Sequence, residues 1–271
     1  MFLRKNIRNI DSKDLVKIRN AIRDMMSRID NQGYGYIAGQ HGWPGKFCKH
    51  EPENDDLGRR IDPFLPWHRA YLYNFEKLMQ ERLDGELVGL PWWDWHSPAT
   101  ISEGIPRSFS DESVDNKPNP LFNFHMNFKA RDDQGREVTI DRETTRNPKP
   151  PGVLAEYIRR FHMQLADIPD LYSLQDFSQF SERLRIGWHN SVHNWVGGDM
   201  GIVAFAAYDP IFWIHHCNID RIWAIWQTRN GIHNIPHHMD NVVLRPFGMT
   251  VKDVLNINSL GYEYASSSTS S

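Results

Sequence analysis

The sequence has little cysteine and no long apolar run. Only 2 of its 271 residues are cysteines, which is too few for a disulfide framework. A hydrophobic core must therefore hold the fold, and 40% of the residues are hydrophobic. No apolar run approaches the roughly 20 residues of a membrane-spanning helix, so we expect no membrane partner. Residues 1–10 contain basic side chains but lack the apolar centre of a signal peptide, which favours a mature or cytoplasmic chain.

An excess of charge of one sign is also lacking. The sequence has 31 basic and 34 acidic residues, for a net charge of −3, and no basic stripe stands out. Nucleic acid is therefore excluded as an expected partner. Internal repeats are absent from the sequence as well. Residues 265–271 form a serine-rich tail that we expect to be disordered.

Helical periodicity is the main secondary-structure signal. Apolar residues recur at three- and four-residue spacing in several segments. Asp209 and Pro210 are typical of a helix N-cap and of the first helical residue. Helices are predicted over residues 12–29, 66–83, 153–165 and 176–186, and from 210 onward.

Residues 97–151 differ in character from the segments around them. They are rich in Pro, Asn, Asp and Arg and show no helical period. The sequence NFKARDDQGREVTI at 127–140 is typical of a β-hairpin that turns at 132–135. We therefore predict a mainly α fold, a helical bundle with long loops and a small β-hairpin excursion.

Histidine gathers among tryptophans in one stretch, residues 188–227, which holds four of the 13 histidines. His189 and His193 are four residues apart, which places both imidazoles on one face of a helix. His215 and His216 follow early in the next helix, where adjacent side chains point roughly 100° apart. Only one of the two can therefore join His189 and His193 on a single ion. Three imidazoles on facing helices predict a metal site.

The motifs of this stretch carry a resemblance to a known family. HNxVHxWVGG, followed by DPIFWIHHxNIDRIWxxWQ, resembles the second copper half-site of the tyrosinase and catechol oxidase family, the type 3 copper proteins. The resemblance implies that His189, His193 and His216 bind one copper ion. It implies that His215 lies behind these ligands.

The segment DPFLPWHRAYL at 62–72 resembles the first copper half-site of the same family, with His68 as its last ligand. In many members the middle ligand lies nine positions earlier. That position here is Arg59, which cannot bind a cation. One interpretation makes His50 the middle ligand and His41 the first, with a lengthened loop before His68. The other makes the first site defective, with His41 and His68 only.

We favour His50 as the middle ligand. A defective site would leave this histidine unexplained, and doubling the length of a loop costs only about 0.6 kcal/mol. Cys48-Lys49-His50 also matches a Cys-x-His sequence in which some family members bond the cysteine sulfur to the imidazole. The resemblance thus implies a thioether between Cys48 and His50. A Cys48–Cys217 disulfide is the alternative, and a free buried Cys217 is our expectation.

Six imidazole ligands suit copper, zinc, iron or nickel. The resemblance implies two copper ions that bind O2, and small phenols as substrates. The implied reactions are ortho-hydroxylation of monophenols and oxidation of o-diphenols to o-quinones. The alternatives are a catechol oxidase without activity on monophenols, an O2 carrier like the hemocyanins, and a zinc hydrolase.

The resemblance also implies roles for residues near the ligands. Asn190, with an upstream glutamate for which Glu182 is the candidate, would hold a water that deprotonates a monophenol. Asn194 would influence activity, and Val203 or Phe205 would line the substrate entrance.

Tyr262-x-Tyr264 resembles the tyrosine motif that ends the catalytic domain in this family. Arg4 or Arg8 is expected to pack near this motif. We therefore predict that residues 1–264 form a single tyrosinase-like catalytic domain.

Overall fold

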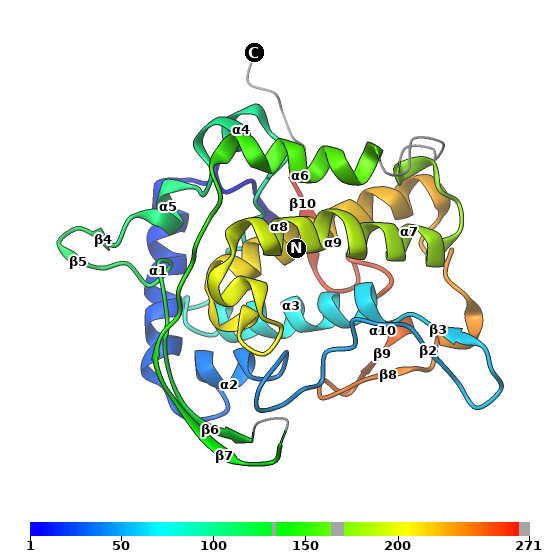
Figure 1. Cartoon of the computed structure of the whole chain (residues 1–271), viewed down its shortest axis with the longest axis horizontal. Helices are drawn as coiled ribbons and strands as arrows, with labels where there is room; N and C mark the ends of the chain where they lie inside the picture. The colour runs from blue at the N-terminus through cyan, green and yellow to red at the C-terminus, as the bar shows by residue number, and fades with distance from the viewer. Residues whose placement is uncertain (132–133, 164–170, 266–271) are drawn as a thin grey trace.

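Two long helices, α3 (Phe64–Gln80) and α9 (Ile211–Asn230), pack against each other at the centre of the protein (Figure 1). The structure is a computed structural model that describes residues 1–131, 134–163 and 171–265. Phe75 of α3 stacks on Trp213 of α9, with ring centroids 3.7 Å apart. The helix predicted over 66–83 is confirmed, although it begins two residues earlier, at Phe64. The N–H groups of a first helical turn have no partner within the helix, so proline is tolerated at any position of that turn.

A third helical segment lies beside α9 and carries the remaining predicted ligands. It consists of α7 (Phe177–Arg183), a π-helical turn η2 (Leu184–His189) and α8 (Asn190–Val196), which follow one another without a break. The segment therefore continues well past the predicted end at residue 186. A π turn is rare and is found mostly at functional sites, and this one ends on a predicted metal ligand. The predicted start of α9 was one residue too early, because Pro210 is the N-cap and Ile211 the first helical residue. Asp209 precedes the cap, and its carboxylate accepts a hydrogen bond from the Ile211 N–H at 3.0 Å.

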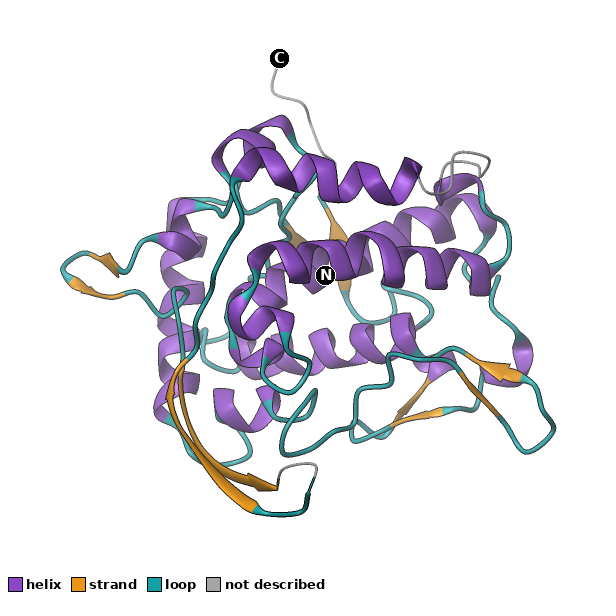
Figure 2. Cartoon of the chain, in the orientation of Figure 1, coloured by secondary structure: helices purple, strands orange, loops and turns teal. Residues whose placement is uncertain are grey.

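Further helices surround this centre, as the secondary-structure colouring shows (Figure 2). Helix α1 packs against α3, and α6 packs against α8. Asp11 caps α1, because its side chain accepts a hydrogen bond from the Lys13 N–H. The bounds are α1 Ser12–Ser27, α2 Tyr34–Ala38, α4 Pro98–Glu103, α5 Arg107–Ser110, α6 Pro151–Met163 and α10 Val251–Val254, with 3-10 turns η1 Leu171–Ser173, η3 Gly198–Gly201, η4 Ala206–Tyr208 and η5 His237–Met239.

The strands in the described part of the chain form two-stranded sheets. The predicted hairpin is confirmed as β6 (His125–Arg131) paired antiparallel with β7 (Glu137–Glu143). Residues 132–133 of its turn, and residues 266–271 of the predicted tail, lie outside the described residues. The other pairs are β1 Phe2–Arg4 with β10 Tyr262–Tyr264, β2 Glu53–Asn54 with β3 Arg60–Ile61, β4 Ser113–Val114 with β5 Lys117–Pro118, and β8 Val243–Leu244 with β9 Met249–Thr250.

The prediction of a mainly α fold is thus confirmed, with long loops and one longer β-hairpin. Among the residues that the structure describes, no helix has both the length and the apolar character needed to cross a bilayer.

The two ends of the described chain meet in a buried ionic network. Strand β1 runs parallel to β10, and the Arg4 guanidinium lies over the Tyr262 ring at 3.6 Å, as expected from the tyrosine motif. Asp220 of α9 is the centre of the network. Its carboxylate accepts hydrogen bonds from Arg4 (3.0 Å), Arg69 (2.5 Å), Tyr262 (2.7 Å) and Tyr264 (2.6 Å). Since Arg69 belongs to α3, the network joins both central helices to both ends of the chain.

We predict that Asp220→Asn destabilises the protein strongly. The change removes the negative charge that faces the buried guanidinium groups of Arg4 and Arg69. Breaking a buried ion pair costs about 3–5 kcal/mol of folding free energy. Urea denaturation followed by circular dichroism measures the loss. The matched control is Lys129→Ala, which removes an exposed pair with Glu137 and should leave the midpoint nearly unchanged. Equal midpoints for Asp220→Asn and the wild type would contradict a stabilising role for the network.

Candidate metal centre

The fold brings the six predicted ligand histidines together in two adjacent groups. One group contains His41, which follows α2, His50 from the loop after it, and His68 from the first turns of α3. The other contains His189 at the end of η2, His193 of α8 and His216 of α9. Within each group, one possible ligand atom per residue lies within 4.8 Å of the others. Cys48 belongs to the first group by the same criterion, and His215 to the second.

The two groups face each other across the contact between α3 and α9. The rings of His68 and His216 stack with centroids 4.3 Å apart, and those of His50 and His189 are 5.8 Å apart. Within the second group, the Nε2 atoms of His193 and His216 are 3.3 Å apart. Two nitrogens that each lie about 2.0–2.1 Å from one tetrahedral ion have a similar separation.

Backbone carbonyls orient most of these imidazoles. A carbonyl that accepts a hydrogen bond from Nδ1–H leaves Nε2 with its lone pair free for a metal. The partners of Nδ1 are Val203 O for His41 (3.2 Å), Phe64 O for His68 (2.8 Å), Arg185 O for His189 (3.3 Å) and Met200 O for His193 (2.6 Å). The Nε2 atoms of His41 and His189 are buried and have no hydrogen-bond partner in the described part of the chain. Buried acceptors of this kind fit a metal ion.

Burial keeps the six predicted ligand histidines neutral. Loss of hydration lowers the pKa of His50 and of His193 to about 4. It also holds the pKa values of His41, His68, His189 and His216 well below the ordinary value. Because a histidine must be unprotonated to bind a metal, these imidazoles are ready to do so at neutral pH.

His50, and not Arg59, lies in the first group. The His50 ring centroid is 5.1 Å from that of His41 and 5.5 Å from that of His68. Arg59 lies in an exposed ion pair with Asp55 at 2.7 Å. The additional loop residues form the β2–β3 hairpin, which rejoins α3 through Asp62 and Pro63.

Cys48 lies beside the His50 ring. Its Sγ is 3.3 Å from Nδ1 and 3.7 Å from Nε2 of His50, and therefore close to the ring carbon between them. Cys48 and Cys217 are both free cysteines, and Cys217 is buried as predicted. The thioether stays a prediction. Joining Sγ to the ring carbon removes two hydrogens and passes two electrons to an oxidant such as O2. Measurement of the intact mass under reducing conditions therefore tests it.

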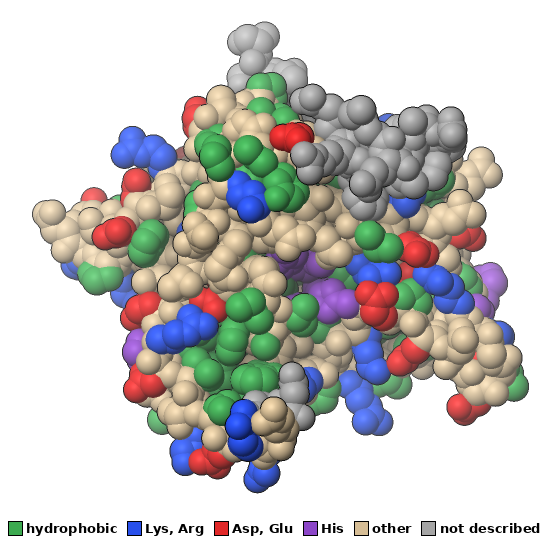
Figure 3. Space-filling view, viewed as in Figure 1, with side chains coloured by type: hydrophobic (Ala, Val, Ile, Leu, Met, Phe, Trp, Pro, Cys, Tyr) green, Lys and Arg blue, Asp and Glu red, His purple; other side chains and the backbone are tan. Residues whose placement is uncertain are grey.

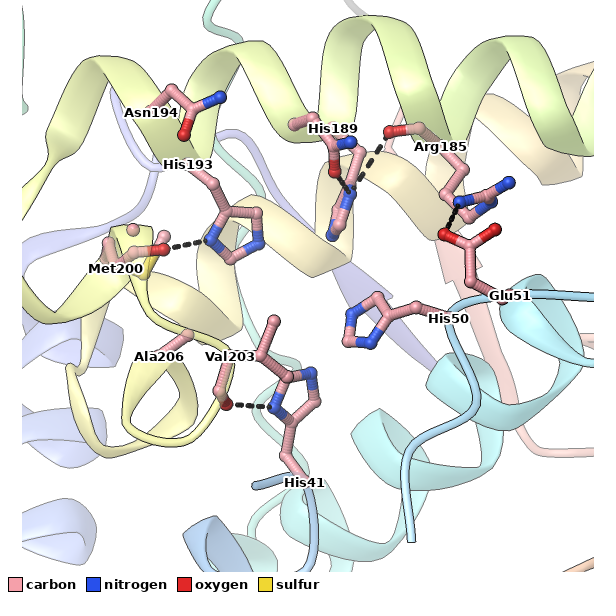
Figure 4. A pocket seen from close by; sticks show the side chains of 12 residues that line it. His41, His50, Glu51, Arg185, His189, His193, Asn194, Met200, Val203 and Ala206 are labelled. Carbon is pink, nitrogen blue, oxygen red and sulfur yellow. Dashed lines mark hydrogen bonds and ion pairs between the residues drawn. The ribbon is translucent and has the colours of Figure 1, made fainter. Parts of the chain in front are cut away.

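A cavity of about 250 Å³ leads from the surface to the histidines. Figure 3 shows histidine side chains near the middle of this face of the protein, with apolar and charged groups around them. Figure 4 shows the histidines of both groups directed into the cavity. Its lining consists of His41, His50, Glu51, Arg185, His189, Asn190, His193, Asn194, Met200, Gly201, Val203 and Ala206.

The predicted residues around the ligands divide into two sets. Asn190, Asn194 and Val203 line the cavity, whereas Phe205 and Glu182 are not among its lining residues. Phe205 packs on Trp43, with ring centroids 5.7 Å apart. The Glu182 carboxylate pairs with Arg60 at 3.0 Å, and both side chains are more than 40% exposed.

Glu51 and Arg185 are lining residues that the sequence did not reveal. Each stands close to a ligand in sequence, since Glu51 follows His50 and Arg185 lies four residues before His189. That proximity was the available signal. The ion pair between them joins two segments that are distant in sequence, so no local sequence pattern predicts it.

Comparison with known proteins agrees with this geometry. The family described as the common central domain of tyrosinase matches residues 31–229, which include all six histidines. The chain belongs to the tyrosinase family. This assignment confirms the resemblance to the type 3 copper proteins that the sequence motifs carry. The two histidine groups fit two copper ions.

The similar proteins include both hemocyanins and tyrosinases. The chain is 29% identical over 258 residues to hemocyanin units G and H of Sepia officinalis, covering 88% of this chain and 40% of that protein. It is 31% identical over 267 residues to a G-type hemocyanin of Enteroctopus dofleini, covering 92% of this chain and 8% of that protein. A tyrosinase structure from Burkholderia thailandensis superposes with a TM-score of 0.74 at 22% identity, covering 99% of this chain and 75% of that one. The chain thus spans less than half the length of these two hemocyanins.

We predict that His50→Ala lowers the copper content from two ions per chain to one, because the first group loses its middle nitrogen. Arg59→Ala should keep both ions, since Arg59 lies in an exposed pair with Asp55. Metal analysis of copper-loaded, desalted protein measures both. Retention of two tightly bound ions by His50→Ala would show that His50 is not a ligand.

Proposed function

We propose that the protein oxidises small phenols with O2. Monophenols would be hydroxylated at the ortho position, and o-diphenols would be oxidised to o-quinones. The observation that carries the proposal is the cavity, which is lined by four of the six histidines, two from each group. A phenol oxidase must admit an aromatic ring to the metals, whereas an O2 carrier needs to admit only O2. Val203, which lines the cavity, is 57% exposed.

Copper, when bound, supplies redox chemistry and Lewis acidity. The protein contributes neutral imidazoles in fixed positions and an aromatic wall that excludes water from them. Phe212 stacks on His216 with centroids 4.1 Å apart, and Phe64 meets His189 edge-on at 4.9 Å. The open side of the cavity leaves a path for the substrate hydroxyl to approach the metals.

Asn190 is the proposed proton-handling position. Its Oδ1 accepts a hydrogen bond from His189 Nδ1 at 2.9 Å, which leaves the amide N–H groups able to hold a water. A phenol hydroxyl titrates near pH 10, so hydroxylation of a monophenol needs a base. An amide cannot take the proton at neutral pH. A carboxylate must therefore act with Asn190.

Two carboxylates compete for this role. Glu182, the expected partner, would have to leave its pair with Arg60 to act. Glu51 is the carboxylate among the lining residues, where it pairs with Arg185. We keep Glu182 as one candidate and add Glu51 as the other. Asn194 and Val203 are proposed to shape the entrance of the substrate, together with the loop that carries Phe205.

Reversible O2 binding is the second candidate function. The hemocyanin relatives favour it, with identities of 29–31% over most of this chain. The same two copper ions would serve, but no phenol would turn over.

The two functions separate in one experiment on copper-loaded protein. We expect O2 consumption and quinone absorbance with para-cresol and with its matched catechol, and loss of both with His216→Ala. A wild-type protein that binds O2 reversibly, releases it under argon and oxidises neither substrate would be an O2 carrier instead.

Asn190→Ala should lower turnover of para-cresol much more than turnover of the catechol. General-base assistance is typically worth about 10²–10⁴-fold, and a catechol needs less of it. Glu182→Gln and Glu51→Gln, assayed on the same pair, identify the carboxylate that acts with Asn190. Equal losses on the two substrates for Asn190→Ala would mean that Asn190 only orients His189.

A further inference from the structure

The wall of the cavity contains one ion pair whose members are very unequally buried. Arg185 donates a hydrogen bond from Nη1 to Glu51 Oε1 at 2.5 Å. The Arg185 side chain is 5% exposed, whereas that of Glu51 is 77% exposed. The Nε atom of Arg185 is buried and has no hydrogen-bond partner among the residues that the structure describes. The cation is therefore part of the protein interior, while its anion lies in water.

The fold fixes Arg185 beside the metal site. The residue belongs to the π turn η2, and its carbonyl accepts the hydrogen bond from His189 Nδ1 at 3.3 Å. Its charge also acts on His50, whose pKa it lowers after the larger effect of burial. Figure 4 shows Arg185 and Glu51 at one edge of the cavity, beside His50 and His189. A ligand in the cavity thus has the metals on one side and a fixed guanidinium on another.

The unequal burial makes the anion exchangeable. A buried cation is costly unless an anion pairs with it, but an exposed carboxylate gains only about 0–1 kcal/mol from such a pair because water solvates it equally well. Glu51 can therefore swing into solvent at little cost when another carboxylate arrives. Arginine is suited to the exchange, since its planar fork can hold a carboxylate with two parallel hydrogen bonds.

Asp62 is a second carboxylate near Arg185, whose charge lowers the pKa of Asp62 against the larger rise that burial causes. It is fully buried and accepts a hydrogen bond from the Phe64 N–H at 3.4 Å. Among the described residues, Glu51 alone accepts a hydrogen bond from the Arg185 guanidinium. Asp62 therefore does not take the place of an incoming anion.

We propose that Arg185 selects phenols in which the ring substituent away from the hydroxyl ends in a carboxylate, and that this carboxylate replaces Glu51 on the guanidinium. The inference rests on the proposed function for its choice of phenols, but the anion-binding step itself needs no turnover. Arg185 would be a specificity-determining residue, and Glu51 the built-in competitor of the substrate.

The test measures binding without oxidation. Copper-loaded protein is titrated calorimetrically, under argon, with phenylacetate and with phenylacetamide, its uncharged counterpart. The wild type should prefer phenylacetate. Arg185→Gln should reduce the preference by about tenfold or more, because a hydrogen bond to a charged group is worth about 1.5–3 kcal/mol. Glu51→Gln should increase the preference, because the competitor is removed.

Two further variants complete the design. Arg185→Lys, which keeps the charge without the fork, should keep part of the preference. Arg60→Gln is the matched control, because it breaks an exposed ion pair with Glu182, and neither residue lines the cavity. This variant should bind both compounds like the wild type. Copper content and circular dichroism verify that each variant is folded and loaded.

The outcomes are distinct from those of the oxidase assay. Equal binding of phenylacetate by the wild type and Arg185→Gln, or weaker binding by Glu51→Gln, would overturn the inference even if phenols are oxidised. If the preference for phenylacetate depends on Arg185 but the protein oxidises no phenol, the anion site stands and the proposed oxidase function is wrong. In an active protein, para-hydroxyphenylacetate should exceed its amide in kcat/KM, and this advantage should disappear with Arg185→Gln.

Discussion

The contact between α3 and α9 is the constraint on which the metal centre depends. Each helix carries a predicted ligand of a different half-site, and the stacking of His68 on His216 at 4.3 Å is part of that contact. The residue after His68 is Arg69, and four residues after His216 is Asp220, so the buried ion pair between them clamps the helices next to the two imidazoles. A shift of either helix would change the distance between the half-sites and break this pair. Packing in the interior thus sets how far apart His68 and His216 lie, and with them the two histidine groups.

A second constraint comes from one loop that serves both half-sites. The carbonyls of Met200 and Val203 orient His193 and His41, which belong to different groups. The loop between α8 and α9 therefore aligns imidazoles on both sides of the centre while its exposed side chains line the cavity. Entrance and ligand orientation are coupled through the same few residues. Substitutions that reshape the entrance without moving these carbonyls are the ones that the centre can accept.

Much of the fold and of the ligand set could be predicted because both rest on local patterns. The spacing of His189 and His193 and the hairpin around residues 127–140 are short-range signals. Glu182 shows where such reasoning ends. Seven residues before His189, it would share a face with that histidine on a regular α-helix, but the π turn between them changes the register, and Glu182 lies on the surface with Arg60. The ion pair of Glu51 with Arg185 could not be predicted, because only the tertiary fold brings the two residues together.

The parallel pairing of β1 with β10 has a consequence for how the protein is made. The Arg4 guanidinium and the Tyr264 hydroxyl are joined at 2.9 Å across 260 residues of sequence. Contacts of such long sequence separation are slow to form, because the entropy of closing the intervening loop is lost before the contact stabilises it. On a ribosome, every histidine of the centre emerges before the tyrosines that complete the charge network around Asp220. The newly made chain therefore passes through a period in which its metal-binding groups exist but the clamp that spaces them is unfinished.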